Sequence, residues 1–174
     1  QLWDASGNVI DEVTYAKATA GKSWERSASG WHLSTDPRGG TPGSANSSPS
    51  SEEEKPPVGP DKPEDPDTPA VTDPVQPGEI VFNELLPDPY AGGSEYLELY
   101  NRSGKPLSVS TLSLAVRKSD GTLSTRYPLA AIVRKLEAKS YILLTKDVES
   151  VSSFYEIAEP SALHQLSKLP ILAN

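Results

Sequence analysis

The apolar residues occur in short runs, and glycine, asparagine, aspartate and proline separate these runs at close intervals. Residues 79–86 form one such run. Residues 95–100 alternate with a period of two, which places Leu97 and Leu99 on one face of a strand. Residues 141–145 form a further run rich in β-formers. Short runs bounded by turn residues predict β-strands.

Two turn signals predict β-hairpins. The sequence Ser-Gly-Asn at residues 6–8 separates two apolar stretches near the start, and Ser-Asp-Gly at residues 119–121 does the same further on. Residues 23–26 and 31–33 are shorter candidate strands.

One helix is expected, over residues 147–155. Asp147 occupies an N-cap position, and Val148, Val151 and Tyr155 follow at helical spacing. Many short strands with little helix predict an all-β fold of the β-sandwich type.

Composition divides the chain into three parts. Residues 48–78 hold nine of the seventeen prolines and no aromatic residue, and residues 48–79 carry nine acidic side chains against two lysines. Such a segment buries too little apolar surface to offset the entropy of ordering, so a disordered, acidic, proline-rich linker is expected. The alternative is a recognition motif for a proline-binding domain. The linker separates residues 1–47 from residues 79–174.

Charge and composition exclude several classes of function. The two flanking parts have net charges near zero, so neither offers a basic face for nucleic acid. The chain has no cysteine, which excludes thiolate chemistry, and no apolar run of about 18 residues, which predicts no membrane span. The chain also lacks methionine, so a fragment of a longer protein is expected, with any export signal upstream of Gln1.

No arrangement typical of nucleophilic catalysis is present, because no serine stands in a Gly-x-Ser-x-Gly turn. We therefore expect neither an enzyme nor a bound cofactor. The candidates for a metal site are three carboxylates, Asp88, Glu95 and Glu98, whose oxygens would suit calcium. The alternative is that these carboxylates lie on the solvent-exposed face of a strand.

Aromatic side chains suggest a contact surface. Tyr96 and Tyr100 fall on the face of residues 95–100 opposite the two leucines, so they are expected to be exposed and available for interaction. Together with Tyr90 and the three tryptophans they would also suit stacking against sugar rings, and core packing is the alternative for all of them.

Two stretches resemble the bacterial lamin-tail domains. IVFNELLPDPYAGGSEYLELYNRSGKPLSVSTLSLAVRKSDG, residues 80–121, is similar to the opening half of that family, and the later YILLTKD and LPILAN continue the similarity. LWDASGNVIDEVTY, followed by DPRGGTPGSANS, is similar to the closing half.

The resemblance implies an immunoglobulin-like β-sandwich. Because the closing half precedes the opening half, it implies the end of one repeat and the start of the next. The two halves are expected to share one core in circularly permuted order, within one chain or between two chains of a swapped dimer.

The implied function is that of a non-catalytic structural or protein-interaction module of a larger exported protein, at the cell surface, in the periplasm or outside the cell. The alternative is a calcium- or glycan-binding accessory domain attached to an enzyme. The expected working surfaces are strand edges and the loops at residues 88–94 and 119–121.

Overall fold

A computed structural model describes residues 1–47, 74–118, 120–132, 135–170 and 172. These residues form mostly β-strands in several sheets, so the predicted all-β fold is confirmed. The elements are β1 Leu2–Trp3, β2 Val9–Asp11, β3 Trp24–Ser27, β4 Gly30–Leu33, β5 Ile80–Leu86, β6 Tyr96–Asn101, β7 Leu107–Ser108, β8 Ser113–Leu114, β9 Tyr127–Pro128, β10 Lys135–Leu136, β11 Tyr141–Thr145, α1 Val148–Phe154, the 3-10 turn η1 Pro160–Ala162 and β12 Leu163–Gln165.

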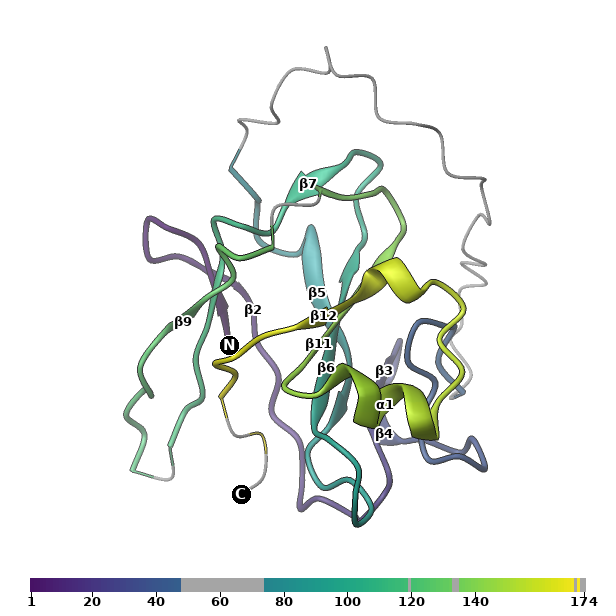
Figure 1. The fold of residues 1–174 in the computed structure, drawn as a ribbon. Helices are drawn as coiled ribbons and strands as arrows, with labels where there is room; N and C mark the ends of the chain where they lie inside the picture. The colour runs from purple at the N-terminus through teal and green to yellow at the C-terminus, as the bar shows by residue number, and fades with distance from the viewer. Residues whose placement is uncertain (48–73, 119, 133–134, 171, 173–174) are drawn as a thin grey trace.

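The strands form three sheets (Figure 1). The largest has six strands in the order β12-β11-β6-β5-β3-β4, a second has the order β2-β1-β8-β9, and β10 pairs with β7. All pairs are antiparallel except β11 with β12. Among the described helices, none has the length and apolar character needed to cross a membrane.

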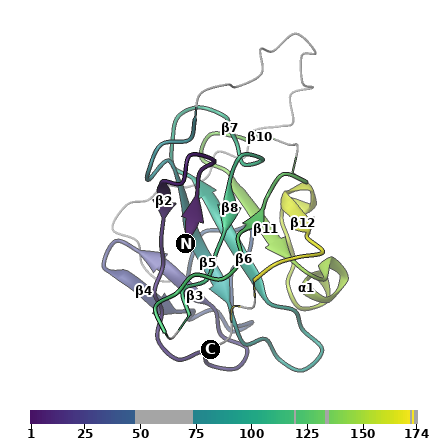
Figure 2. The same cartoon turned by 90° about the vertical axis from the view of Figure 1, so that its left-hand side faces the viewer.

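Strands from residues 1–47 lie beside strands from residues 80–174 in both larger sheets (Figures 1 and 2). β1 pairs with β8, and β3 pairs with β5. One apolar cluster contains Leu2 and Ile10 together with residues of all three sheets, such as Leu97, Leu107 and Leu114. The main core is therefore built by both parts of the chain.

A β-bulge in β5 decides which of its side chains face this core. The register between β5 and β6 shifts between Phe82 and Glu84, so Asn83 is the extra residue. Phe82 and Leu85 both join the main core, whereas Glu84 and Leu86 point to the opposite face of the six-stranded sheet. Without the shift, Glu84 would follow Phe82 into the apolar core.

The opposite face of the six-stranded sheet is also covered, which corrects one expectation from the sequence. Leu97 and Leu99 do share the main core, as predicted. Tyr96 and Tyr100, however, are buried rather than exposed. Tyr96 packs under α1 with Tyr155, and Tyr100 stacks against Tyr141. A buried tyrosine offers no surface to a partner, so these two residues are wrong as exposed candidates.

The predicted local elements are confirmed. The Asp147 side chain accepts a hydrogen bond from Ser150 N at 3.0 Å and so caps α1. The turn at residues 6–8 joins β1 to β2. Residue 119 of the second predicted turn lies outside the described part of the chain, and residues 120–121 lie between the arms that contain β8 and β9. In both turns a glycine adopts a positive φ.

The second part of the fold includes residues that precede residue 79. Val75 is buried in the main core, and Gly78 N donates a hydrogen bond to Ile10 O at 3.0 Å. Residues 74–78 therefore belong to the fold and not to the predicted linker. The remaining linker residues, 48–73, lie outside the described part of the chain.

Candidate interaction site

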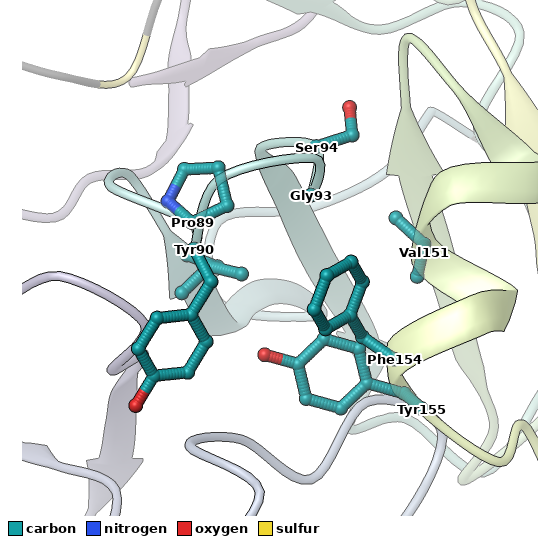
Figure 3. Close-up of a pocket in the computed structure, with 8 residues that line it drawn as sticks. Pro89, Tyr90, Gly93, Ser94, Val151, Phe154 and Tyr155 are labelled. Atoms are coloured by element: carbon teal, nitrogen blue, oxygen red, sulfur yellow. The ribbon is translucent and has the colours of Figure 1, made fainter.

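Two large apolar side chains are exposed on one side of the described structure. Tyr90, in the loop between β5 and β6, is 49% exposed, and Phe154, at the end of α1, is 41% exposed. They border a shallow hollow whose walls include Pro89, Gly93 and Tyr155 (Figure 3). We call Tyr90, Phe154 and the residues around this hollow the aromatic surface.

The hollow is too small to hold an ordinary small-molecule ligand. Its volume is about 10 Å³, whereas small-molecule pockets usually measure about 300–1,000 Å³. Exposed aromatic side chains around a shallow depression are instead typical of protein contact surfaces, where they contribute large contact areas at low entropic cost.

The Tyr90 ring packs directly against the backbone of Gly21. Gly21 N donates a hydrogen bond to Asp88 O at 2.7 Å. A Cβ atom at Gly21 would lie 2.1 Å from Cζ of Tyr90, so no other residue fits between this backbone and the ring. A Cβ atom at Gly39 would in turn lie 1.8 Å from Gly21 O. The aromatic surface is thus in contact with the loop of residues 39–47 through Gly21.

Tyr155 connects the aromatic surface to the interior. Its ring packs edge-on against the ring of Tyr96, with the centroids 5.6 Å apart and an interplanar angle of 85°. The hydroxyl of Tyr96 donates a hydrogen bond of 2.5 Å to Glu84 Oε1. A chain of direct contacts therefore leads from the exposed hollow to a buried carboxyl group.

Glu84 is the middle member of three buried glutamates that lie side by side on neighbouring strands. Glu25 on β3 pairs in register with Glu84 on β5, and Glu84 pairs with Glu98 on β6. All three have no exposed surface. We call this set the glutamate row. Directly paired residues have Cβ atoms about 4.5–5.5 Å apart, so the three carboxyl groups are close neighbours.

The loop of residues 39–47 covers the glutamate row and donates hydrogen bonds to all three members. Thr41 donates from its backbone N to Glu84 Oε1 at 2.9 Å, and its hydroxyl, with a single proton to share, lies 3.1 Å from both Glu84 Oε2 and Glu25 Oε1. Gly43 N donates to Glu98 Oε2 at 2.5 Å, and Ser47 Oγ donates to Glu25 Oε2 at 2.8 Å. These bonds hold the loop against the sheet.

Burial changes the protonation of this region. It raises the pKa of Glu84 to about 7, against hydrogen bonds that lower it. Burial and the neighbouring Glu84 charge raise the pKa of Glu98 well above its usual range. Burial likewise raises the pKa of Tyr96 well above 10 and that of Tyr155 to about 12. Glu84 and Glu98 therefore both hold a proton more readily than an exposed glutamate does.

The three predicted calcium candidates do not come together. Glu98 is buried in the glutamate row, where Gly43 N and Asn83 Nδ2 donate to it. Asp88 and Glu95 are partly exposed, and Glu95 Oε2 accepts from Leu172 N at 3.3 Å. Within the part of the chain that the structure describes, no group of three or more His, Cys, Asp or Glu side chains is arranged to hold a metal ion.

Some residues of the site were not singled out from the sequence. Phe154 lies outside the stripe of Val148, Val151 and Tyr155, and an apolar residue off the buried stripe of a capped helix is a detectable sign of an exposed contact residue. Glu25 and Thr41 carry no comparable sign, because only the tertiary fold brings them to Glu84.

A second cavity, of about 560 Å³, lies on the other side of the six-stranded sheet. Phe82 and Leu97 line it from that sheet and Leu114 from the smaller one. It borders Leu172, whose carbonyl accepts a hydrogen bond from the hydroxyl of Tyr15. None of the site residues predicted from the sequence lines this cavity.

Comparison of the chain with protein-family models, with curated proteins and with solved structures gave no match.

Proposed function

We propose that the chain is a non-catalytic protein-interaction module of the lamin-tail, immunoglobulin-like type, part of a larger exported protein. In this proposal it binds a protein partner through the aromatic surface. The observation that carries the proposal is the exposure of Tyr90 and Phe154 on adjacent elements, above a hollow too small for an ordinary small ligand. The Tyr90 loop is one of the two loops that the sequence suggested as working surfaces.

The lamin-tail assignment is supported by the positions of the residues that carry the resemblance. Asn83 and Glu84 come from the opening motif, Glu98 from the next one, and Thr41 and Gly43 from the GTPG motif of the other half. Hydrogen bonds join Thr41 to Glu84, and they join Gly43 and Asn83 to Glu98, so residues of both motifs meet at the glutamate row. Motifs that lie far apart in sequence but meet in one network are expected if the two halves form a single domain in permuted order.

The proposed binding surface can be tested by site-specific photo-crosslinking. A photoreactive phenylalanine analogue would replace Phe154 in the exported parent protein, with the same analogue at the exposed hairpin residue Thr122 as the control. We expect a discrete cross-linked protein from position 154 and not from position 122. We also expect the product to disappear when Tyr90→Ser is added. No specific product from position 154, or an equal product from both positions, would refute the proposal.

Glycan binding is the second candidate, because exposed aromatic rings such as Tyr90 and Phe154 also stack against sugars. A glycan array with the wild-type chain and a Tyr90→Ser, Phe154→Ser double variant separates the two candidates. Binding to a defined glycan that both substitutions abolish would replace the protein partner with a carbohydrate.

A further inference from the structure

The glutamate row combines close carboxyl groups with uncharged hydrogen-bond donors. Glu84 accepts from Thr41 and Tyr96, and Glu98 accepts from Gly43 and Asn83. None of these donors carries a positive charge. Two ionised carboxylates on directly paired positions of adjacent strands, both without exposed surface, would repel each other in a region that water does not screen.

The other titratable or charged groups around Glu84 do not supply a compensating charge next to it. The paired position on β6 is another glutamate, that on β3 is Glu25, and beyond Glu25 in the same row lies the exposed His32 of β4. On the far side of Glu98 the paired residue of β11 is Leu143. The remaining groups near this face are Asp36 and Arg38, which precede the covering loop, Tyr96 on β6, and Tyr155 and Glu156 at the end of α1. Lys22 lies near Asp36, and its Nζ donates a hydrogen bond to Ser34 O at 3.1 Å.

Arg38 does not neutralise the row, because its guanidinium is already paired. It forms hydrogen bonds of 3.0 and 3.2 Å with the two carboxylate oxygens of Asp36. A proton is therefore the simplest way to relieve the repulsion between Glu84 and Glu98, and the raised pKa of both groups agrees with this.

The covering loop contacts both the glutamate row and the base of the aromatic surface. At one end, Gly39 O accepts from Ser23 N at 2.7 Å, and the Gly39 backbone lies against Gly21, which supports the ring of Tyr90. Next to it, a Cβ atom at Gly40 would lie 2.6 Å from Glu84 Oε1. The loop fits against both the carboxyl group and the base of the aromatic surface, so it cannot lift from one without disturbing the other.

We propose that Glu84 and Glu98 together bind a proton that keeps the loop of residues 39–47 closed, and that loss of this proton at higher pH loosens the loop and the aromatic surface. Only the consequence for binding rests on the proposed function. The closing of the loop itself is a property of the described fold and can be tested without any partner.

The test is a pH titration of the whole chain by NMR from about pH 5.5 up to about 10, so that it spans the loss of the last proton from the pair. We expect the amide protection factors of Thr41 and Gly43, corrected for the intrinsic pH dependence of exchange, to fall by about tenfold or more. The protection factor of Leu99, in the middle of β6, should stay nearly constant. The ring resonances of Tyr90 should shift over the same pH range as the two loop amides.

Glu84→Gln and Glu98→Gln remove one ionisation each and should abolish or strongly reduce the response. Glu137→Gln, at an exposed carboxylate away from the row, is the matched control and should leave it unchanged. Constant protection of Thr41 and Gly43 in the wild-type chain would overturn the proposal even if the glutamine variants failed to fold. A response that persists in both variants would assign the proton to another group and overturn it as well.

Failure of this experiment is distinguishable from failure of the proposed function. The NMR titration reports on the loop without a partner, whereas the cross-linking reports on the partner at a single pH. A cross-linked product together with loop protection that does not depend on pH would support the interaction module and refute only the pH-dependent closing of the loop.

Discussion

Burying a glutamate side chain costs free energy, and in this fold the neighbouring hydrogen-bond donors offset that cost. A carboxyl group without exposed surface loses its hydration, and each of the three in the glutamate row regains hydrogen bonds from the covering loop. These bonds satisfy the oxygens and also fix the loop. The same residues therefore serve packing and electrostatics, and substitutions at them are expected to affect both.

The stability of the fold should depend on pH through Glu84. Its pKa is about 7 in the folded chain, against about 4.5 for an unperturbed glutamate. The folded state thus binds the proton more tightly, so this contribution to stability is complete below about pH 4.5 and is lost as the pH rises through about 7. One pKa unit corresponds to about 1.4 kcal/mol, so the loss is at most on the order of 3 kcal/mol.

Urea unfolding at a series of pH values between about 4.5 and 8.5 measures this effect. The free energy of unfolding should fall with rising pH in the wild-type chain and change less in Glu84→Gln. A free energy of unfolding that rises across the same range in the wild-type chain would contradict the assigned direction.

The packing around the glutamate row also leaves no space for a side chain at Gly40. A Cβ atom there would lie 2.3 Å from the Tyr96 hydroxyl and 2.6 Å from Glu84 Oε1. Gly40→Ala should therefore lower the free energy of unfolding by about 1–3 kcal/mol, in the range of overpacked core substitutions. Gly104→Ala is the control, because nothing lies within 4 Å of its Cβ position. Equal effects of the two substitutions, measured by urea unfolding, would be inconsistent with this packing.

Among the elements, β6 shows how far the sequence could predict the fold. Its alternation correctly placed Leu97 and Leu99 in the main core. It could not show that the other face is covered, because the covering groups come from residues 39–47 and from α1, far away in sequence. Period-two alternation reports which side chains share a face, and it does not report what lies over that face.

The bulge in β5 was not predictable for a related reason. Asn83 has no feature that marks it as an extra residue, and its effect depends on groups from the first part of the chain. Phe82 N donates to Asp11 Oδ2 at 2.8 Å, and Arg26 Nε donates to Phe82 O at 2.6 Å. Arg26 also forms an ion pair of 2.5 Å with Asp11. These side chains satisfy the backbone groups of Phe82, where the bulge disturbs the ladder.

The helix α1, by contrast, was predictable because its cap is local. Asp147→Ala removes the hydrogen bond to Ser150 N and should cost about 1 kcal/mol of stability, whereas Asp147→Asn retains an acceptor and should cost less. Urea unfolding compares the two variants. Hydrogen exchange should also show faster opening at the start of α1 in Asp147→Ala. Equal loss in both variants would indicate that the charge of Asp147, and not its acceptor, stabilises the helix.

For the whole molecule, the central feature is that both larger sheets combine strands from residues 1–47 with strands from residues 80–174. β3 and β4 extend the sheet built by β5 and β6, while β1 lies between β2 and β8. The hydrogen bonds and the ion pair among Asp11, Arg26 and Phe82 join the two parts of the chain near the bulge. Removing residues 1–47 would expose the apolar side of β5 and the backbone edge of β8 to water, and exposed edges of this kind promote association.

Separate expression of the two parts tests this interdependence. We expect residues 74–174 alone to be poorly folded or aggregated, because Leu2 and Ile10 supply part of the main core and β3 covers the edge of β5. Adding residues 1–47 should restore a dispersed NMR spectrum with one copy of each part in the complex. A fragment of residues 79–174 should be rescued less well, because it lacks the buried Val75. The intact chain should have the mass of a monomer by light scattering, whereas a stable dimer would indicate that the same contacts form between two chains. A well-dispersed spectrum from residues 74–174 alone, unchanged by residues 1–47, would show that the later part folds independently of the first.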